Sequence, residues 1–174
     1  MKIQKFGYNR IIESMGDLFV FFEVQNKDKN EAYNNHFCYS NNENKSSREA
    51  KTPLDLAIYP KNSQIEYISF FVEDEKLSRE EIKNKIIYTN DSILITDERF
   101  TFDKRYIDIK MEFNYYIQNR DVFVVAKDAK IDLIGYRLDD DNYVLFDKED
   151  NFSGVVFKNL TDSQMKELEK SNVL

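Results

Sequence analysis

The sequence predicts an α+β fold: a mainly antiparallel, twisted sheet of many short strands with two or three short helices, one of them at the C-terminus. Leu54 to Val72 alternates apolar and polar residues, passes through a turn at Pro60 to Ser63, and returns as an aromatic and β-branched run, which is typical of a β-hairpin. Other short apolar runs recur with short connections, which favours antiparallel pairing. Thr161 and Gln164 form a capping-box pattern that predicts a C-terminal helix.

The other strands are predicted from local pattern. Residues 106–113 alternate most clearly, with Ile107 and Ile109 on one face and Asp108 on the other. Residues 122–126 are wholly apolar, so this strand is expected to be covered on both faces. Gly135 predicts a bulge or a close backbone approach. The remaining predicted strands are 18–24, 36–39, 85–88, 92–96, 131–138, 143–146 and 154–157.

A helix is also predicted over Leu77 to Asn84, because Ser78 and Glu81 form a second capping-box pattern. Asn90 and Asp91 predict a tight turn between the strands 85–88 and 92–96.

The length of 174 residues predicts a single domain over 1–174. A long polar loop is expected at about 25–53, where Asn, Lys, Glu and Ser dominate and one apolar island, 36–39, forms a short strand. Loops of this length inside a compact domain are often functional, although an insertion without function has the same appearance.

The formal net charge of −7 disfavours binding to nucleic acid and to anionic membranes. It favours a basic protein partner, although plain solubility explains it equally well. The single cysteine, Cys38, excludes an intramolecular disulfide and fits a reducing compartment. No apolar run is long enough for a signal peptide or a membrane span. We therefore expect a cytoplasmic protein, and the composition is typical of an AT-rich bacterial genome.

His36 and Cys38 are the only residues of their kinds, and as i and i+2 they share one face of a strand. A Cys-His nucleophile pair also needs a group that orients the imidazole, and the sequence identifies none. No catalytic residue is therefore predicted. One His and one Cys do not make a zinc site, residues 147–154 lack the calcium-loop pattern, and no Gly-rich phosphate loop is present. Neither a metal nor a cofactor is expected.

Acidic residues are densest around the predicted strand 143–146, in two groups at its opposite ends. An acidic docking surface and merely solvated turns both explain them. Neighbouring tyrosines after residue 113 add a second interface signal, since tyrosine is enriched at protein interfaces. The candidate partner-binding residues are Asp139, Asp140, Asp141, Asp147, Glu149, Asp150, Tyr115 and Tyr116.

The segments Leu54 to Ser69 and Tyr143 to Thr161 together resemble small bacterial proteins, some of which are immunity proteins of contact-dependent or polymorphic toxin systems. The resemblance implies a protein that binds and neutralises a toxin without catalysis.

The leading functional hypothesis is thus a non-enzymatic protein-binding module, an immunity or inhibitor protein that neutralises a basic partner. The alternative is a small enzyme or ligand-binding protein that uses carboxylates in a β-lined cleft, so enzymatic activity stays open. The oligomeric state is not predicted.

Overall fold

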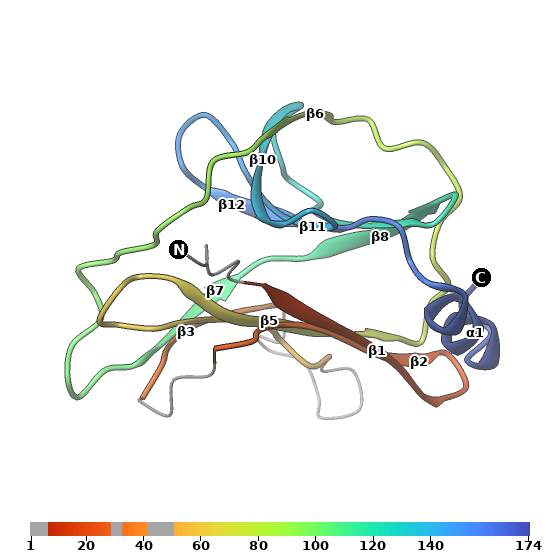
Figure 1. Ribbon diagram of the computed structural model, residues 1–174, viewed down its shortest axis with the longest axis horizontal. Coiled ribbons are helices and arrows are strands. Elements are labelled where there is room, and N and C mark those ends of the chain that lie inside the picture. The colour runs from red at the N-terminus through yellow and green to blue at the C-terminus, as the bar shows by residue number, and fades with distance from the viewer. Residues whose placement is uncertain (1–6, 29–32, 42–50) are drawn as a thin grey trace, which may run out of the picture.

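Two six-stranded sheets face each other in the computed structural model, which describes residues 7–28, 33–41 and 51–174 (Figure 1). Sheet A has the order β1 (Tyr8–Gly16), β2 (Phe19–Asn26), β5 (Ile65–Glu73), β4 (Leu54–Ile58), β3 (Asn35–Ser40) and β7 (Tyr106–Lys110). Sheet B has the order β6 (Lys85–Thr89), β10 (Asp132–Asp139), β11 (Asn142–Phe146), β12 (Phe152–Phe157), β9 (Asp121–Ala126) and β8 (Phe113–Gln118). Neighbouring strands are antiparallel except in the parallel pairs β3–β7 and β6–β10.

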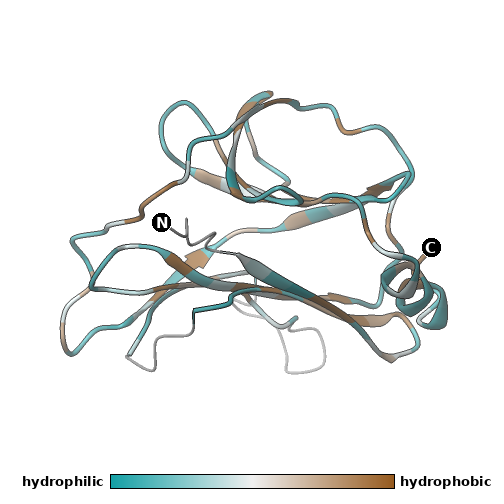
Figure 2. Ribbon diagram, viewed as in Figure 1, coloured by the Kyte–Doolittle hydropathy of each residue, from teal (hydrophilic) through white to brown (hydrophobic). Residues whose placement is uncertain are grey.

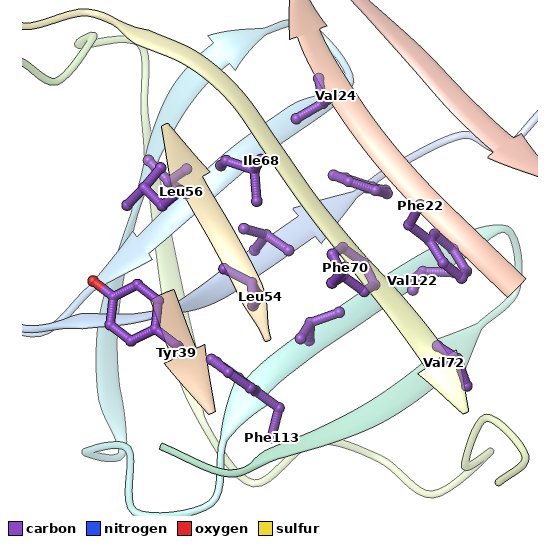
Figure 3. Packing of buried hydrophobic residues seen from close by; sticks show 14 of the residues in the cluster. Phe22, Val24, Tyr39, Leu54, Leu56, Ile68, Phe70, Val72, Phe113 and Val122 are labelled. Carbon is purple, nitrogen blue, oxygen red and sulfur yellow. The ribbon is translucent and has the colours of Figure 1, made fainter. Parts of the chain in front are cut away.

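The core lies between the sheets, because alternate residues of each strand point inward. Phe22 stacks on Phe70 with ring centroids 4.8 Å apart, and Phe157 of sheet B approaches Phe70 at 5.7 Å. Figure 3 shows Phe22 and Phe70 among the inward side chains, with Val24 and Ile68 from the same two strands and Leu56 from β4. Each fully buried side chain of this size contributes about 1.5–3 kcal/mol to folding.

Sheet B has a second apolar cluster on its other face. Phe123, Val125, Leu145 and Val156 are buried there, and two partly buried residues pack against them, Ile82 from the segment before β6 and Ile86 from β6 itself. Strand β9 is therefore covered on both faces, which confirms the prediction for residues 122–126. Figure 2 shows that hydrophilic residues predominate in the connections and in the helix.

The prediction of two or three helices is wrong: the described residues form a mostly β structure of two mixed sheets with one helix, α1 (Asp162–Lys170). Residues 77–84 are not helical, because their backbone groups bond to other segments. The carbonyl oxygen of Ser78, which would accept the first bond of such a helix, accepts instead from the N–H of Ile117, and the N–H of Ser78 donates to the carbonyl oxygen of Tyr115. These bonds extend the edge of sheet B and override the local capping pattern.

Two further strand predictions need correction. Residues 106–113 are not one strand: β7 belongs to sheet A and β8 to sheet B, and the chain crosses between the sheets at Met111 and Glu112. Residues 92–96 form no strand but connect the sheets, with the N–H of Ile95 donating to the carbonyl oxygen of Ser63. Consequently β6 pairs in parallel with β10 and forms no hairpin with residues 92–96.

Other predictions are confirmed. The hairpins β4–β5 and β11–β12 form as expected, and Thr161 and Gln164 make the predicted capping box of α1. A Cβ at Gly135 would lie 2.7 Å from Cδ1 of Tyr88, so this glycine does permit a close approach. The island at 36–39 is part of β3, whereas residues 29–32 and 42–50 of the predicted loop lie outside the described residues. The described chain has no helix long and apolar enough to cross a membrane.

The side chain of Arg10, on β1, bonds to sheet B and to α1. Its Nη1 donates to the carbonyl oxygen of Lys158 at 2.7 Å, and its Nε and Nη2 donate to Oε1 of Gln164 at 3.2 and 3.0 Å. Its other acceptors are the carbonyl oxygens of Asp141 and Asn159 and Oδ1 of Asn142. Burial lowers the pKa of Arg10, and nearby carboxylates, Asp141 foremost, act in the opposite direction.

We expect Arg10→Ala to lower the free energy of unfolding by about 3 kcal/mol, because it leaves several partly buried acceptors without their donor. Urea denaturation monitored by circular dichroism measures the loss. Arg79→Ala, at an exposed position, is the matched control and should change stability by less than about 0.5 kcal/mol. Equal midpoints for the two variants would contradict the bridging role of Arg10.

Two glycines allow a second comparison. Gly16 and Gly154 have nearly the same backbone angle, φ +147° and +146°, but only Gly154 is crowded: a Cβ there would lie 1.9 Å from the carbonyl oxygen of Val124. Gly16→Ala should cost about 1–3 kcal/mol for backbone strain alone. Gly154→Ala should cost about 3 kcal/mol more, because strands β9 and β12 must also separate. Denaturant midpoints of both variants test this, and equal losses would be inconsistent with the close approach.

Candidate functional site

The face of sheet A that points away from sheet B carries a row of polar side chains. We call this the outer face of sheet A. Register places Glu23 of β2 opposite Ser69 of β5, Ser69 opposite Asp55 of β4, Asp55 opposite Cys38 of β3, and Cys38 opposite Asp108 of β7. Side chains directly opposite on one face lie about 4.5–5.5 Å apart at Cβ. Three carboxylates that are far apart in the sequence therefore share one row across five strands.

His36 and Tyr67 bond to the central carboxylate of this row. Nδ1 of His36 lies 2.9 Å from Oδ1 of Asp55, and the hydroxyl of Tyr67 donates to Oδ2 of Asp55 at 2.8 Å. The ring of Tyr106 stacks on the imidazole at 4.6 Å with an interplanar angle of 8°. Burial, and then the bond to Asp55, raises the pKa of Tyr67, so its phenol remains a donor. Asp55 is thus the orienting group for His36 that the sequence did not identify.

Cys38 lies on the same face as His36, as the sequence predicted, but its surroundings are wrong for a nucleophile. Burial, followed by the charges of Asp55 and Asp108, raises the pKa of the Cys38 thiol to about 11. A reactive cysteine needs an electropositive environment that stabilises the thiolate, and here carboxylates stand opposite it on both neighbouring strands. The geometry offers a rigid polar network and no activated thiol.

Aromatic side chains extend this face toward β1. Phe71 stacks on Phe19 with ring centroids 5.2 Å apart, and its ring is tilted by 46° against that of Phe21 at 5.1 Å. Acidic residues stand opposite these rings, with Glu13 paired to Phe21 and Glu73 paired to Phe19 in the strand register. The rings are half-buried, so the outer face of sheet A offers apolar area between carboxylates.

A further aromatic group surrounds the start of β7. The guanidinium of Arg105 lies 5.3 Å from the ring centroid of Tyr33 and 5.5 Å from that of Phe102. These rings are 78% and 85% exposed, and Tyr106 is 61% exposed. Within the described residues the Arg105 side chain forms no hydrogen bond or ion pair. Tyrosine and arginine are the residue types that dominate interface hot spots, so this end of sheet A has the composition of a binding surface.

The acidic residues predicted from sequence lie in two turns at opposite ends of β11. Asp139 is part of the β10–β11 turn, where its Oδ1 accepts from the N–H of Asp141 at 2.9 Å. Asp140 pairs with Arg137. Asp147 is buried in the β11–β12 loop: burial opposes its ionisation, but hydrogen bonds from Asn151 and Glu149 outweigh burial and lower its pKa. Glu149 and Asp150 are exposed.

The two predicted tyrosines point to opposite faces of β8. Tyr115 lies between the sheets, stacked on Phe70 with centroids 6.2 Å apart, and burial raises its pKa. Tyr116 packs against the second apolar cluster on the far face of sheet B. The structure therefore does not bring the eight candidate residues onto one surface, and their part in binding stays a prediction.

A small cleft of about 170 Å³ opens between the sheets beside Tyr115, and it bears on the alternative of carboxylate chemistry. Its two carboxylates are ion-paired, Glu75 with Lys51 at 2.7 Å and Glu112 with Lys127 at 3.2 Å. Both carboxylates of this cleft therefore already have a lysine as their partner. Among the described residues, no group of three or more His, Cys, Asp or Glu is placed to hold a metal ion.

Comparison with known proteins adds no assignment: no protein-family model and no curated protein sequence matches this chain. The resemblance to immunity proteins therefore stays a prediction.

Sequence reasoning missed the outer face of sheet A as a site. The individual strands did indicate residues of this face, because Asp55 and Asp108 occupy the polar positions of alternating segments. Only the strand order, with β4, β3 and β7 adjacent, unites them.

We expect the reaction of Cys38 with iodoacetamide to be slow at pH 7–8 and to increase steeply only as the pH approaches 11, since the thiolate is the reacting species and the pKa is raised to about 11. Mass spectrometry across this pH range measures the profile, and the urea-unfolded chain supplies the control, with an ordinary profile centred near pH ~8.5. Asp108→Asn should move the folded-state profile to lower pH. A folded-state midpoint at or below that of the unfolded chain would restore the nucleophile hypothesis.

Proposed function

We propose that this chain is a non-enzymatic protein-binding module and that the outer face of sheet A receives a basic surface of its partner. The observation that carries the proposal is the in-register row of Glu23, Asp55 and Asp108 across sheet A. An immunity or inhibitor role in the cytoplasm of a bacterium is the form of this proposal that the sequence favours.

The size of the face supports a macromolecular partner. Six strands spaced about 4.8 Å apart span about 24 Å, and strands of five to nine residues extend about 17–30 Å. A standard interface buries about 800 Å² on each partner. A flat surface of these dimensions suits a protein better than a small substrate, which binds in a concave site.

The charges and side-chain types support a basic partner. Glu13 and Glu73 add to the three carboxylates of the row, so these acidic residues outnumber the lysine at the end of β7, Lys110. Negative potential of this kind speeds association with a positively charged partner over a distance of about 8 Å at physiological salt. The phenylalanine cluster and the aromatic group around Arg105 supply the apolar area that gives an interface its affinity.

We expect Glu13→Gln/Asp108→Asn to weaken binding of the basic probe peptide (Lys-Gly)₅ by about 2- to 30-fold at low salt. Each lost exposed ion pair costs about 0.2–1 kcal/mol. Titration monitored by ¹H–¹⁵N NMR gives both the affinity and the location of the shifts, which should fall on β1, β2, β5, β4, β3 and β7.

The matched control is Glu149→Gln/Asp150→Asn, which removes the same charge from an exposed loop. Asn tolerates the left-handed backbone of Asp150, φ 63°. If this control weakens binding as much as the outer-face variant, the probe responds only to net charge and the proposed site is wrong.

A further inference from the structure

Strand β7 is an open edge of sheet A, whereas two other edge strands are covered. At β1 the N–H of Ser14 donates to Oε2 of Glu167 in α1 at 3.3 Å. At β8 the segment through Ser78 forms a parallel bridge with Tyr116. Within the described residues, the free side of β7 makes no backbone hydrogen bond to another segment.

The register shows which backbone groups of β7 do not bond to β3. The N–H of His36 donates to the carbonyl oxygen of Arg105, and the N–H of Met111 donates to that of Ser40. In a parallel pair this pattern directs Ile107 and Ile109 toward β3. The N–H and C=O groups of Tyr106, Asp108 and Lys110 therefore point away from the sheet, as three donors and three acceptors in one line.

We propose that β7 accepts an extended segment of a partner protein as a seventh, antiparallel strand of sheet A, with a Lys or Arg side chain of that segment opposite Asp108. This inference rests on the proposed function, because it names the form in which the basic partner binds. Strand addition at an open edge takes its affinity from main-chain hydrogen bonds and its specificity from alternate side chains.

The charge of Asp108 indicates which kind of segment can pair with β7. Two copies of this chain that paired antiparallel over the whole of β7 would place Asp108 directly opposite Asp108, with Tyr106 opposite Lys110. Like charges directly opposite each other destabilise strand pairing, so the edge disfavours a second copy. A cationic side chain at the same position gains an ion pair with Asp108 on the outer face.

Exposed aromatic rings at the start of β7 favour the binding of an added strand at this edge over its binding at another edge strand. Tyr106 lies on the edge strand itself, and Tyr33 and Phe102 flank Arg105 beside it. An added strand that passes these rings would cover apolar area that the described residues leave in water. Aromatic and β-branched cross-strand pairs contribute about 0.2–1 kcal/mol each, so a β-branched segment with a central basic residue fits best.

The test uses the short peptide acetyl-TVKVT-amide and hydrogen exchange read by NMR. Binding should slow the exchange of the amides of Tyr106, Asp108 and Lys110, while Ile107 and Ile109, already bonded to β3, should change little. Asp108→Lys should reverse the preference, so that this variant binds acetyl-TVEVT-amide more tightly than acetyl-TVKVT-amide.

Two N-methylated peptides give the matched control. In the proposed antiparallel register the lysine amide points to β7 and both valine amides point to solvent. Methylation of the lysine amide should weaken binding about fivefold or more, the equivalent of one lost hydrogen bond, whereas methylation of the valine amides should leave binding unchanged.

Equal binding of the two methylated peptides, or no binding of acetyl-TVKVT-amide at millimolar concentration, would overturn strand addition. Chemical shifts spread over the outer face of sheet A without protection of β7 would also overturn it. The proposed basic-partner function would survive that last result, since (Lys-Gly)₅ tests it without requiring a strand.

Discussion

The guanidinium of Arg10 is the group on which the arrangement of the two sheets depends. It starts on an edge strand of sheet A and donates to the backbone of sheet B and to Gln164 of α1. A buried charge is tolerated only when its donors are satisfied, and here the acceptors come from three separate segments. Gln164 is also the N3 residue of the α1 capping box, where its Oε1 accepts from the N–H of Thr161, so the side chain that completes this capping box also fixes the helix to β1. Asp139 and Asp141 lie close enough to oppose the effect of burial on Arg10, which gives part of the acidic turn a structural role.

The two sheets differ in how many of their faces are buried. Sheet B has apolar clusters on both of its faces, and Ile82, in the segment before β6, packs against the second one. Sheet A shares the central core on one side and presents Asp55, His36 and Asp108 on the other. A sheet that is buried on both faces has few side chains left for recognition. The polar and aromatic groups available for binding therefore gather on sheet A.

Sequence reasoning succeeded where local chemistry decides the structure. The turn after Ile58 and the capping box at Thr161 act within a few residues, and both were predicted. It failed where distant segments compete for the same backbone groups. Ser78 begins a capping-box pattern, but its backbone groups bond to the edge strand β8, so no helix starts there. Likewise residues 106–113 alternate without a break, and nothing local marks Met111 as the point where the chain leaves sheet A.

The site could not be predicted for the same reason, because its residues come from strands that are distant in the sequence. Its chemistry also shows that residue types alone do not identify a catalytic site. His36, Asp55 and Cys38 have the residue types of a catalytic group, and the first two are hydrogen-bonded. What separates this arrangement from a nucleophile site is the sign of the local field. Burial, and then the carboxylates opposite Cys38 on both neighbouring strands, raise the pKa of its thiol, whereas catalysis would require a positive neighbour that lowers it. The same carboxylates attract cations to the open edge at β7. The same row of charges thus contributes to the raised pKa of the thiol and underlies the preference for a basic partner that we propose.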